Sequence, residues 1–390
     1  MSEGVLAINV GSSSIKFALY GTAADTPLLR GQVESIGSDP SFGARGELAE
    51  TLGDARVPAN GGHAGAIDWL VGLLGSRIDV KLRAIGHRIV HGGMRHVAPE
   101  RIDGAVIESL QLLVPLAPDH QPAGLAAVRA VAQRWPELPQ VACYDTAFHA
   151  RQPRLARLFA LPREMADEGI VRYGFHGLSY EYIAGALPGI AGGQAEGRVV
   201  VAHLGHGASL CAMRHGRSES TSMGFSVIDG LVMGQRSGRI DPGVLLYLMQ
   251  QKGWSAAEVA DLLLHRSGLL GVSGISEDVR DLEASDRPEA AEALDLFAWR
   301  AGAEIAGMAS AIEGLDALVF TGGIGEHSVA MRARIAARCG WMGVALDEAA
   351  NARSASAIHA AGARVGVYVV PTDEEVVIAR ATRAVVGLDA

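Results

Sequence analysis

A strand–turn–strand pattern at residues 4–21 limits the folds that this chain can adopt. Two apolar runs, residues 5–10 and 15–20, flank the glycine and serines of residues 11–14. The β-branched and aromatic content of both runs is typical of strands. A glycine turn lets the backbone approach a ligand, and its successive N–H groups can bind an anion. With Asn9 and Lys16 beside it, the turn indicates a nucleotide phosphate with a metal nearby, although a hairpin without a ligand explains the same residues about equally well.

A second copy of the pattern favours the functional interpretation. Residues 199–216 again place a glycine turn between two apolar runs. Aligned without gaps, Ile8 to Gly11 falls on Ala202 to Gly205. Two such segments far apart in one chain predict a duplicated pair of domains, with a phosphate between the two turns.

The composition is that of a globular protein with about two domains. The chain has 390 residues, of which 49% are hydrophobic and 20% charged, so it can bury a large core. The net charge of -9 and the lack of a basic run argue against nucleic acid as the main partner. Three scattered cysteines predict neither a disulfide framework nor a zinc site and favour a cytoplasmic protein. We also expect no signal segment and no membrane span.

The rest of the sequence alternates between strands and helices, which predicts an α/β fold. Residues 84–93 predict a buried strand that ends in a glycine turn, and it contains Arg88, a charge that is costly to bury unless it is paired or meets an anion. Residues 141–149 predict another strand that brings Asp145 to its C-terminal end, where ligands bind in open α/β sheets. From about residue 150 the pattern restarts, with strands at 199–204, 208–213 and 317–320 and a closing helix at 374–386.

Three glycine-containing segments of this second part point to a ligand. The strand at residues 317–320 runs into a glycine-rich turn before a helix, a junction that favours nucleotide contact over a plain turn. Arg236 lies in a glycine-punctuated loop that suits phosphate or carboxylate, and a solvated surface arginine is an equal alternative. His176 follows and precedes glycines within residues 174–177, which modestly favours an active-site turn over a structural histidine.

In their order along the chain, these motifs resemble those of the acetate kinase family, the short-chain acyl kinases of the sugar kinase and actin superfamily. The resemblance covers nearly the whole length and is carried by residues 9–17, 86–93, 145–149, 172–177, 203–207, 222–225, 233–238, 320–328 and 372–375. It implies two duplicated actin-like, ribonuclease H-like α/β domains with a central ligand cleft. The domain at 1–149, completed by a helix at about 374–390, would bind the acyl substrate. The domain at 150–373 would carry the nucleotide site and a dimer interface.

The resemblance further implies reversible phosphorylation of acetate by ATP in a homodimer, with Mg²⁺ as cofactor or Mn²⁺ in its place. Metal ligands would be Asn9 and Glu374. Catalytic groups would be Asp145, His176 and Arg236. The acyl substrate would contact Arg88, Val90, His120 and Phe175. The nucleotide would contact Ser12, Lys16, His203, Leu204, Gly205, His206, Gly207, Asp278, Val279, Arg280, Gly323, Ile324, Gly325, Glu326 and His327.

The chemistry of a carboxylate acceptor agrees with these roles. A carboxylic acid with a pKa of about 4 is ionised at neutral pH, so it needs no general base to become a nucleophile. The barrier lies in aligning two anions and neutralising the charge on the transferred group. Arginines, a histidine and Mg²⁺ suit that task. Asp145 is therefore interpreted as organising magnesium, its waters or an arginine rather than as a proton acceptor.

The sequence departs from the family pattern at four positions. Family members usually have asparagine where His206 and His327 stand, and histidine keeps hydrogen bonding but adds bulk and charge capacity. They commonly have asparagine at Gln121 and an apolar residue at Asp119, which helps to enclose the methyl end of the acyl chain. A carboxylate is costly to bury there, so either Asp119 points elsewhere or the substrate is not plain acetate.

Alternative functions stay open at this point. Propionate or butyrate kinase activity is the nearest, because one methylene changes binding by only about 1–3 kcal/mol. A sugar kinase would need a general base for a neutral hydroxyl and would not need Arg88 buried at the substrate. An actin-like nucleotide switch shares the fold but has no need for so many charged groups around an acyl position.

Overall fold

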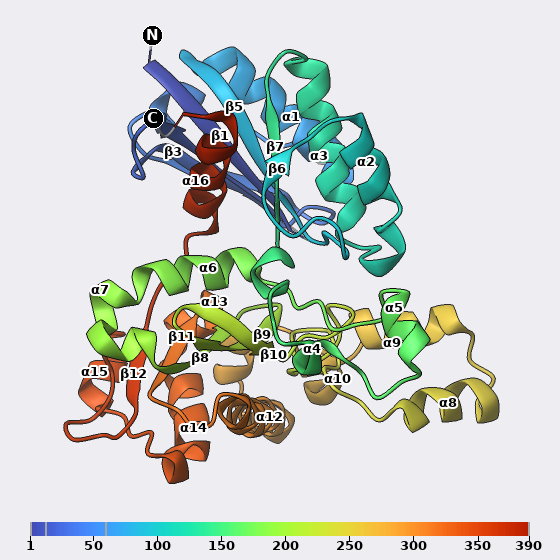
Figure 1. Cartoon of the computed structure of the whole chain (residues 1–390), viewed down its shortest axis with the longest axis vertical. Helices are drawn as coiled ribbons and strands as arrows, with labels where there is room; N and C mark the ends of the chain where they lie inside the picture. Colours follow the sequence, from blue (N-terminus) through green and yellow to red (C-terminus); the bar gives the residue numbers. More distant parts are fainter. Residues whose placement is uncertain (1, 12–13, 59–60, 389–390) are drawn as a thin grey trace. The chain divides into compact units, whose positions relative to one another are not determined.

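The protein chain divides into two compact units, each built around one β-sheet (Figure 1). The computed structural model describes residues 2–11, 14–58 and 61–388. Unit 1 comprises Met1–Phe148 with Asp373–Ala390, and unit 2 comprises His149–Thr372. In the part of the chain that the structure describes, no helix is both long and apolar enough to cross a membrane. The acyl and nucleotide roles predicted for the two units stay predictions.

Unit 1 has a seven-stranded sheet in the order β4-β3-β2-β1-β5-β7-β6. Its strands are β1 (Ser2–Val10), β2 (Ile15–Gly21), β3 (Pro27–Glu34), β4 (Ser41–Arg45), β5 (Val80–Ile89), β6 (Glu100–Arg101) and β7 (Gln140–Tyr144). Its helices are η1 (Ala49–Leu52), α1 (Gly62–Arg77), α2 (Gly104–Gln111), η2 (Val114–Leu116), α3 (Gln121–Arg134) and α16 (Glu374–Val386). The short helix η3 (Ala147–His149) leads from unit 1 into unit 2.

Unit 2 has a five-stranded sheet in the order β10-β9-β8-β11-β12. Its strands are β8 (Arg198–Leu204), β9 (Ala208–Arg214), β10 (Arg217–Thr221), β11 (Ala317–Thr321) and β12 (Gly366–Val369). Before β11 come α4 (Arg154–Arg157), α5 (Arg163–Asp167), α6 (Gly177–Ala186), α7 (Pro188–Ala191), η4 (Gly192–Glu196), α8 (Pro242–Gln251), α9 (Ala256–His265), α10 (Gly268–Ser273), α11 (Val279–Glu283) and α12 (Pro288–Ala311). After β11 come α13 (Gly322–His327), α14 (Val329–Arg338), η5 (Gly340–Met342) and α15 (Glu348–Ala352).

The two sheets repeat one arrangement of strands. In unit 1, β3, β2 and β1 pair antiparallel, and β5 and β7 then continue parallel to β1. In unit 2, β10, β9 and β8 pair antiparallel, and β11 and β12 continue parallel to β8. The connection from β1 to β2 and the connection from β8 to β9 therefore occupy equivalent places in the two sheets. This shared order confirms the predicted duplication of an α/β unit, while the central ligand cleft stays a prediction.

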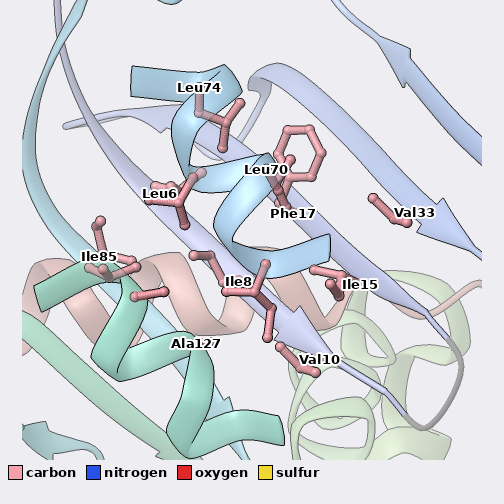
Figure 2. Packing of buried hydrophobic residues seen from close by; sticks show 14 of the residues in the cluster. Leu6, Ile8, Val10, Ile15, Phe17, Val33, Leu70, Leu74, Ile85 and Ala127 are labelled. Carbon is pink, nitrogen blue, oxygen red and sulfur yellow. The ribbon is translucent and has the colours of Figure 1, made fainter. Parts of the chain in front are cut away.

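Strand β1 separates an apolar face from a polar one, because successive side chains of a strand point to opposite faces. Leu6, Ile8 and Val10 belong to the apolar core that includes Leu70 of α1 (Figure 2). Asn9 points to the other face, where it meets the start of α16. The sequence of β1 thus buries one face and delivers a polar side chain to the other.

Helix α16, near the end of the chain, packs closely on the sheet formed by its beginning (Figure 1). A glycine on β5 makes this close packing possible. A Cβ on Gly86 would lie 2.1 Å from Thr382 Oγ1 and 2.5 Å from Ile378 Cγ2, both on α16. The close fit places the first turn of α16 beside the end of β1.

The glycine-rich segment after β11 differs from its prediction. The sequence predicts a turn, but residues Gly322–His327 form the short helix α13. Ser328 separates it from α14, because the Ser328 side chain accepts a hydrogen bond from the Met331 N–H as an N-cap. Glycine has a weak helix propensity, so residue preferences alone favour a turn where local hydrogen bonds build a helix.

Candidate active site

In unit 1, Arg88 lies at the centre of a buried polar cluster at the ends of β1, β5 and β7. Its Nε and Nη2 donate to Asp145 Oδ2 at 3.0 and 2.6 Å, and its Nη1 donates to Asn9 Oδ1 at 3.2 Å and to Val10 O at 3.3 Å. The side chains of Arg88 and Asp145 are 13% and 1% exposed. Burial lowers the pKa of Arg88, but Asp145 and Glu374 outweigh that effect and hold the pKa above its ordinary value. The arginine is therefore a permanent, anchored cation.

Two adjacent glutamates of α16 converge on Asn9. Asn9 Nδ2 donates to Glu374 Oε2 at 2.8 Å and to Glu375 Oε1 at 3.0 Å. Glu375 is buried, and burial followed by the charge of Glu374 raises its pKa, against a lowering by the Asn9 hydrogen bond and by Lys16. The sequence analysis assigned a role to Glu374 and missed Glu375, because only the fold shows which glutamate points inward. Across residues 2–11, 14–58 and 61–388, no three His, Cys, Asp or Glu side chains are grouped to hold a metal ion.

The first glycine turn is described only in part. Lys16 is the cross-strand partner of Asn9, so both side chains leave the sheet on the same face, and Lys16 is exposed. The Gly11 N–H donates to Ser14 O at 2.8 Å across the turn. Ser12, a predicted nucleotide contact, lies outside the described residues.

The predicted acyl-binding residues of unit 1 lie around the start of α3. Val90 is buried, and His120 is the half-buried residue before the helix. Buried Gln121 accepts from the His91 N–H at 3.2 Å and donates to His91 O at 3.0 Å, so it joins the segment after β5 to α3. Asp119 is exposed, so its carboxylate bears no burial cost. Where Asp119 lies relative to the acyl substrate stays a prediction.

In unit 2, the turn between β8 and β9 lies against a histidine and an arginine. A Cβ on Gly207 would lie 2.7 Å from Arg236 Nη2 and 3.2 Å from His176 Nε2, so only glycine fits between them without a shift. Arg236 is 9% exposed, and its Nη1 donates to Val227 O at 2.7 Å. The rings of His176 and His203 stack with centroids 4.3 Å apart. The structure thus brings four predicted site residues together at one turn.

The glycine-rich helix α13 lies beside the same turn. A Cβ on Gly205 would lie 3.9 Å from Gly323 N, and one on Gly322 would lie 2.8 Å from Leu204 O. Glu326 Oε1 accepts from the Gly322 N–H at 2.9 Å and from the Thr372 N–H at 3.2 Å. Glu326 therefore holds this segment together. Of the other predicted contacts here, Gly325 is buried, Ile324 is half-buried and His327 is exposed.

His206, one of the departures from the family pattern, faces an acidic segment. Its Nε2 lies 3.1 Å from Glu277 Oε2, and its carbonyl accepts from the Gly234 N–H at 3.2 Å. Arg280 donates to both carboxylate oxygens of Asp278, and these side-chain hydrogen bonds lower the pKa of Asp278. The predicted nucleotide contact Val279, the first residue of α11, is buried. The predicted contacts at 278–280 therefore lie near the turn through His206.

Phe175 is buried in unit 2, whereas Val90 belongs to unit 1. The carbonyl of Phe175 lies 3.0 Å from His149 Nε2. The acyl pocket that the two apolar residues would share stays a prediction.

Arg332 is a residue that the sequence analysis missed. It is fully buried on α14 and donates five hydrogen bonds, to Asn351 Oδ1, Asn351 O, Gly325 O, Glu326 O and Ser354 Oγ, at 2.8–3.0 Å. Burial lowers its pKa. Two of its acceptors are carbonyls of α13, so Arg332 supports the segment beside the β8–β9 turn. In the sequence it looks like any charged residue of an amphipathic helix.

Comparisons with known proteins agree with this geometry. A family model described as the acetokinase family matches residues 4–380. Acetate kinase from Rhodopseudomonas palustris is 50% identical over 388 residues, covering 97% of this chain and 98% of the relative. Acetate kinase from Rhizobium meliloti is 45% identical, with 99% of each chain covered.

Solved structures extend the likeness to the fold. A propionate kinase from Francisella tularensis has a TM-score of 0.88 and 35% identity, covering 98% of this chain and 100% of its own. Acetate kinase from Porphyromonas gingivalis has a TM-score of 0.84 and 33% identity, with the same coverage. The predicted α/β fold class is confirmed, and the chain belongs to the acetokinase family.

Proposed function

We propose that this chain catalyses the reversible, ATP-dependent phosphorylation of acetate by direct in-line phosphoryl transfer. The observation that carries the proposal is the buried, anchored cation Arg88, in a chain of the acetokinase family. Propionate is the alternative acceptor, because the relatives include a propionate kinase as well as acetate kinases. An anionic acceptor needs a fixed cation, and a neutral sugar hydroxyl does not.

Arg88 would hold the acceptor carboxylate through a single N–H group. A guanidinium has five N–H donors, and the described hydrogen bonds use four of those of Arg88. Among the described residues, one N–H of Nη2 is left for the substrate. Asp145 would act by holding this guanidinium in place, because its Oδ2 accepts hydrogen bonds from both Nε and Nη2 of Arg88. This agrees with a carboxylate that organises an arginine rather than one that accepts a proton.

The β8–β9 turn would hold the transferring phosphoryl group. Arg236 would supply positive charge and His176 a hydrogen-bond donor, since both reach the same side of Gly207. A loose phosphoryl-transfer transition state carries charge on its equatorial oxygens, and removing a cation that neutralises it costs about 10³-fold or more in rate. His203 and the glycines at residues 205, 207 and 323 would contact the nucleotide phosphates, with residues 278–280 farther along the same nucleotide.

Magnesium fits the cluster around Asn9 and Glu374. Mg²⁺ prefers one or two carboxylates and completes its shell with water and substrate phosphates. Asn9 brings Glu374 and Glu375 within 3.0 Å of one amide, and the raised pKa of Glu375 shows that burial and Glu374 disfavour its charge. A cation would relieve that repulsion. When bound, Mg²⁺ would supply charge neutralisation for the phosphates, and Asn9 and Glu374 would hold it.

We further propose that the protein works as a homodimer through unit 2. All ten residues of α8 are exposed or half-buried, although the helix contains Val244, Leu246, Tyr247 and Met249, each at least 36% exposed. A helix this apolar gains little from folding against water unless another surface covers it. A second copy of the chain is the occupant that the family resemblance implies.

The activity is tested by trapping the product. The full chain is incubated with Mg-ATP and with acetate, propionate, butyrate or glucose, and hydroxylamine converts any acyl phosphate into a coloured hydroxamate. We expect hydroxamate with acetate or propionate and none with glucose. Nucleoside diphosphate that forms with glucose and with none of the acids would identify a sugar kinase. If none of the acids yields hydroxamate, the proposal is rejected.

A further inference from the structure

We propose that Tyr180 and Ser209 are positioning residues that hold His176 as the neutral tautomer protonated on Nε2. The inference rests on the proposed function, in which His176 faces the transferring phosphoryl group. Tyr180 and Ser209 carry no charge and are fully buried. His176 would then act as a hydrogen-bond donor beside the cation Arg236.

The three side chains form a continuous hydrogen-bonded chain. His176 Nδ1 lies 2.8 Å from Ser209 Oγ, and Ser209 Oγ lies 2.5 Å from the Tyr180 hydroxyl oxygen. Ser209 and Tyr180 are both fully buried, while His176 is half-buried. Ser209 therefore joins a solvent-shielded phenol to the inner nitrogen of the histidine ring.

A backbone hydrogen bond to Tyr180 favours one order of the protons along these three side chains. The Tyr180 oxygen also takes a hydrogen bond from the backbone of His203, where the donor is the amide N–H. The pKa of Tyr180 is raised well above its usual value by burial, so the phenol keeps its proton. In the proposed arrangement the phenol donates to Ser209 Oγ, and the Ser209 hydroxyl donates to His176 Nδ1. A neutral imidazole that accepts on Nδ1 carries its proton on Nε2.

The local backbone conformation directs this Nε2–H towards the turn between β8 and β9. His176 has φ 58°, a left-handed conformation that non-glycine residues rarely adopt, and it directly precedes α6. Tyr180 lies four residues later, one helical turn away and on the same face. The opposite ring nitrogen, Nε2, is the one that a Cβ on Gly207 would approach to 3.2 Å.

A parallel contact supports the assignment. His203 Nδ1 lies 2.8 Å from Ser179 Oγ, and its ring stacks on that of His176. Ser209 and His203 are cross-strand partners in the β8–β9 pair. Each histidine thus has its Nδ1 against a buried serine. Two stacked imidazolium rings would repel each other, so a neutral donor at His176 leaves the positive charge to Arg236.

The direct test is the protonation state of His176, measured by NMR. Long-range ¹H–¹⁵N correlation spectra of ¹⁵N-histidine-labelled full chain at pH 8 distinguish a bare ring nitrogen from a protonated one, and the His176→Asn variant assigns the signals. We expect a bare Nδ1 and a protonated Nε2. A protonated Nδ1 would overturn the inference. This measurement does not depend on turnover, so it determines the protonation state of His176 even if no acyl phosphate forms.

Kinetics provide the second test. Ser209→Ala should lower kcat by roughly 10- to 100-fold with less than about threefold change in the KM for ATP, because the ring is misplaced rather than lost. Ser209→Thr keeps the hydroxyl and should restore most of kcat. The kcat of Tyr180→Phe should lie between those of Ser209→Ala and Ser209→Thr. Tyr182→Phe, on the same helix, is the matched control and should leave kcat unchanged. Equal kcat for Ser209→Ala and the parent would reject the positioning role.

Discussion

The key charged residues of unit 1 are a buried arginine and the carboxylate that holds it in place. Arg88 and Asp145 are both largely buried, and each is the other's charge partner. Removing one partner of a buried pair leaves an uncompensated charge, whereas the intact pair gives a rigid cation. The functional value of the pair is therefore geometric, since it fixes a guanidinium at the end of β5.

Neutralising Asp145 should impair turnover more than binding. Asp145→Asn can still accept a hydrogen bond from Arg88 but no longer balances its charge. We expect kcat for acetate to fall by roughly 10²- to 10³-fold while the KM for acetate changes little. Steady-state kinetics measure both, and Asp68→Asn, at an exposed carboxylate on α1 of the same unit, is the control. A large rise in the KM with normal kcat would contradict this role.

The buried histidine His87 should make unit 1 sensitive to acid. Its Nε2 lies 2.7 Å from Gln140 Oε1, and burial lowers its pKa to about 4. The unfolded chain therefore binds a proton that the folded chain excludes, so this stability is complete above about pH 6.5 and is lost as the pH falls towards 4. At pH 5 the loss is about 2 kcal/mol for a single such group.

Urea unfolding at several pH values tests this sensitivity. His87→Gln should reduce the fall in unfolding free energy between pH 7.5 and 5 by that amount. Equal pH dependence in the parent and His87→Gln would contradict the assignment.

At the scale of secondary-structure elements, one arginine ties three helices of unit 2 together. Arg332 on α14 donates to carbonyls of α13, to both oxygens of Asn351 on α15 and to the Ser354 hydroxyl. All five acceptors are neutral, so hydrogen bonds alone compensate the cost of burying the guanidinium.

Arg332→Lys should therefore destabilise unit 2 although it keeps the charge. An ammonium has three donors and lacks the planar fork, so buried acceptors lose their partners at a cost of about 2–4 kcal/mol. Arg334→Lys on the same helix is the control, because Arg334 is exposed and pairs with Asp295 at the surface. Thermal unfolding should separate the two variants. Equal thermal unfolding midpoints for the two variants would show that the planar guanidinium of Arg332 contributes nothing to stability.

Structural features that depend on neighbouring residues can be predicted from the sequence, whereas contacts between residues far apart in the chain cannot. The strands around residues 11–14 and 205–207 follow from apolar alternation and glycine turns, and the structure confirms them. Helix α13 was expected to be a turn, because its glycines have a weak helix propensity. Hydrogen bonds of Glu326 and Arg332 support the helix instead. Glu375 and Ser209 could not be found, because their partners lie 366 and 33 residues away. The family motifs selected candidate residues, but only the fold shows which atoms meet.

At the scale of the whole molecule, the proposed dimer depends on α8. Leu246→Arg places a charge on the helix where a second copy would pack. We expect light scattering after gel filtration to report a dimer for the parent and a monomer for Leu246→Arg. Leu112→Arg, at an isolated leucine of unit 1 that is 80% exposed, should leave the mass unchanged. Equal masses for the parent and Leu246→Arg would show that α8 does not form the dimer interface.

The most direct measurement for the whole molecule is a ³¹P NMR time course of the full chain with Mg-ATP and acetate. We expect an acyl phosphate signal that grows in equal amount with ADP as ATP declines, and a rate reduced by about 10³-fold in Arg236→Ala. ADP that appears with inorganic phosphate and without acyl phosphate, in acetate and propionate alike, would contradict it.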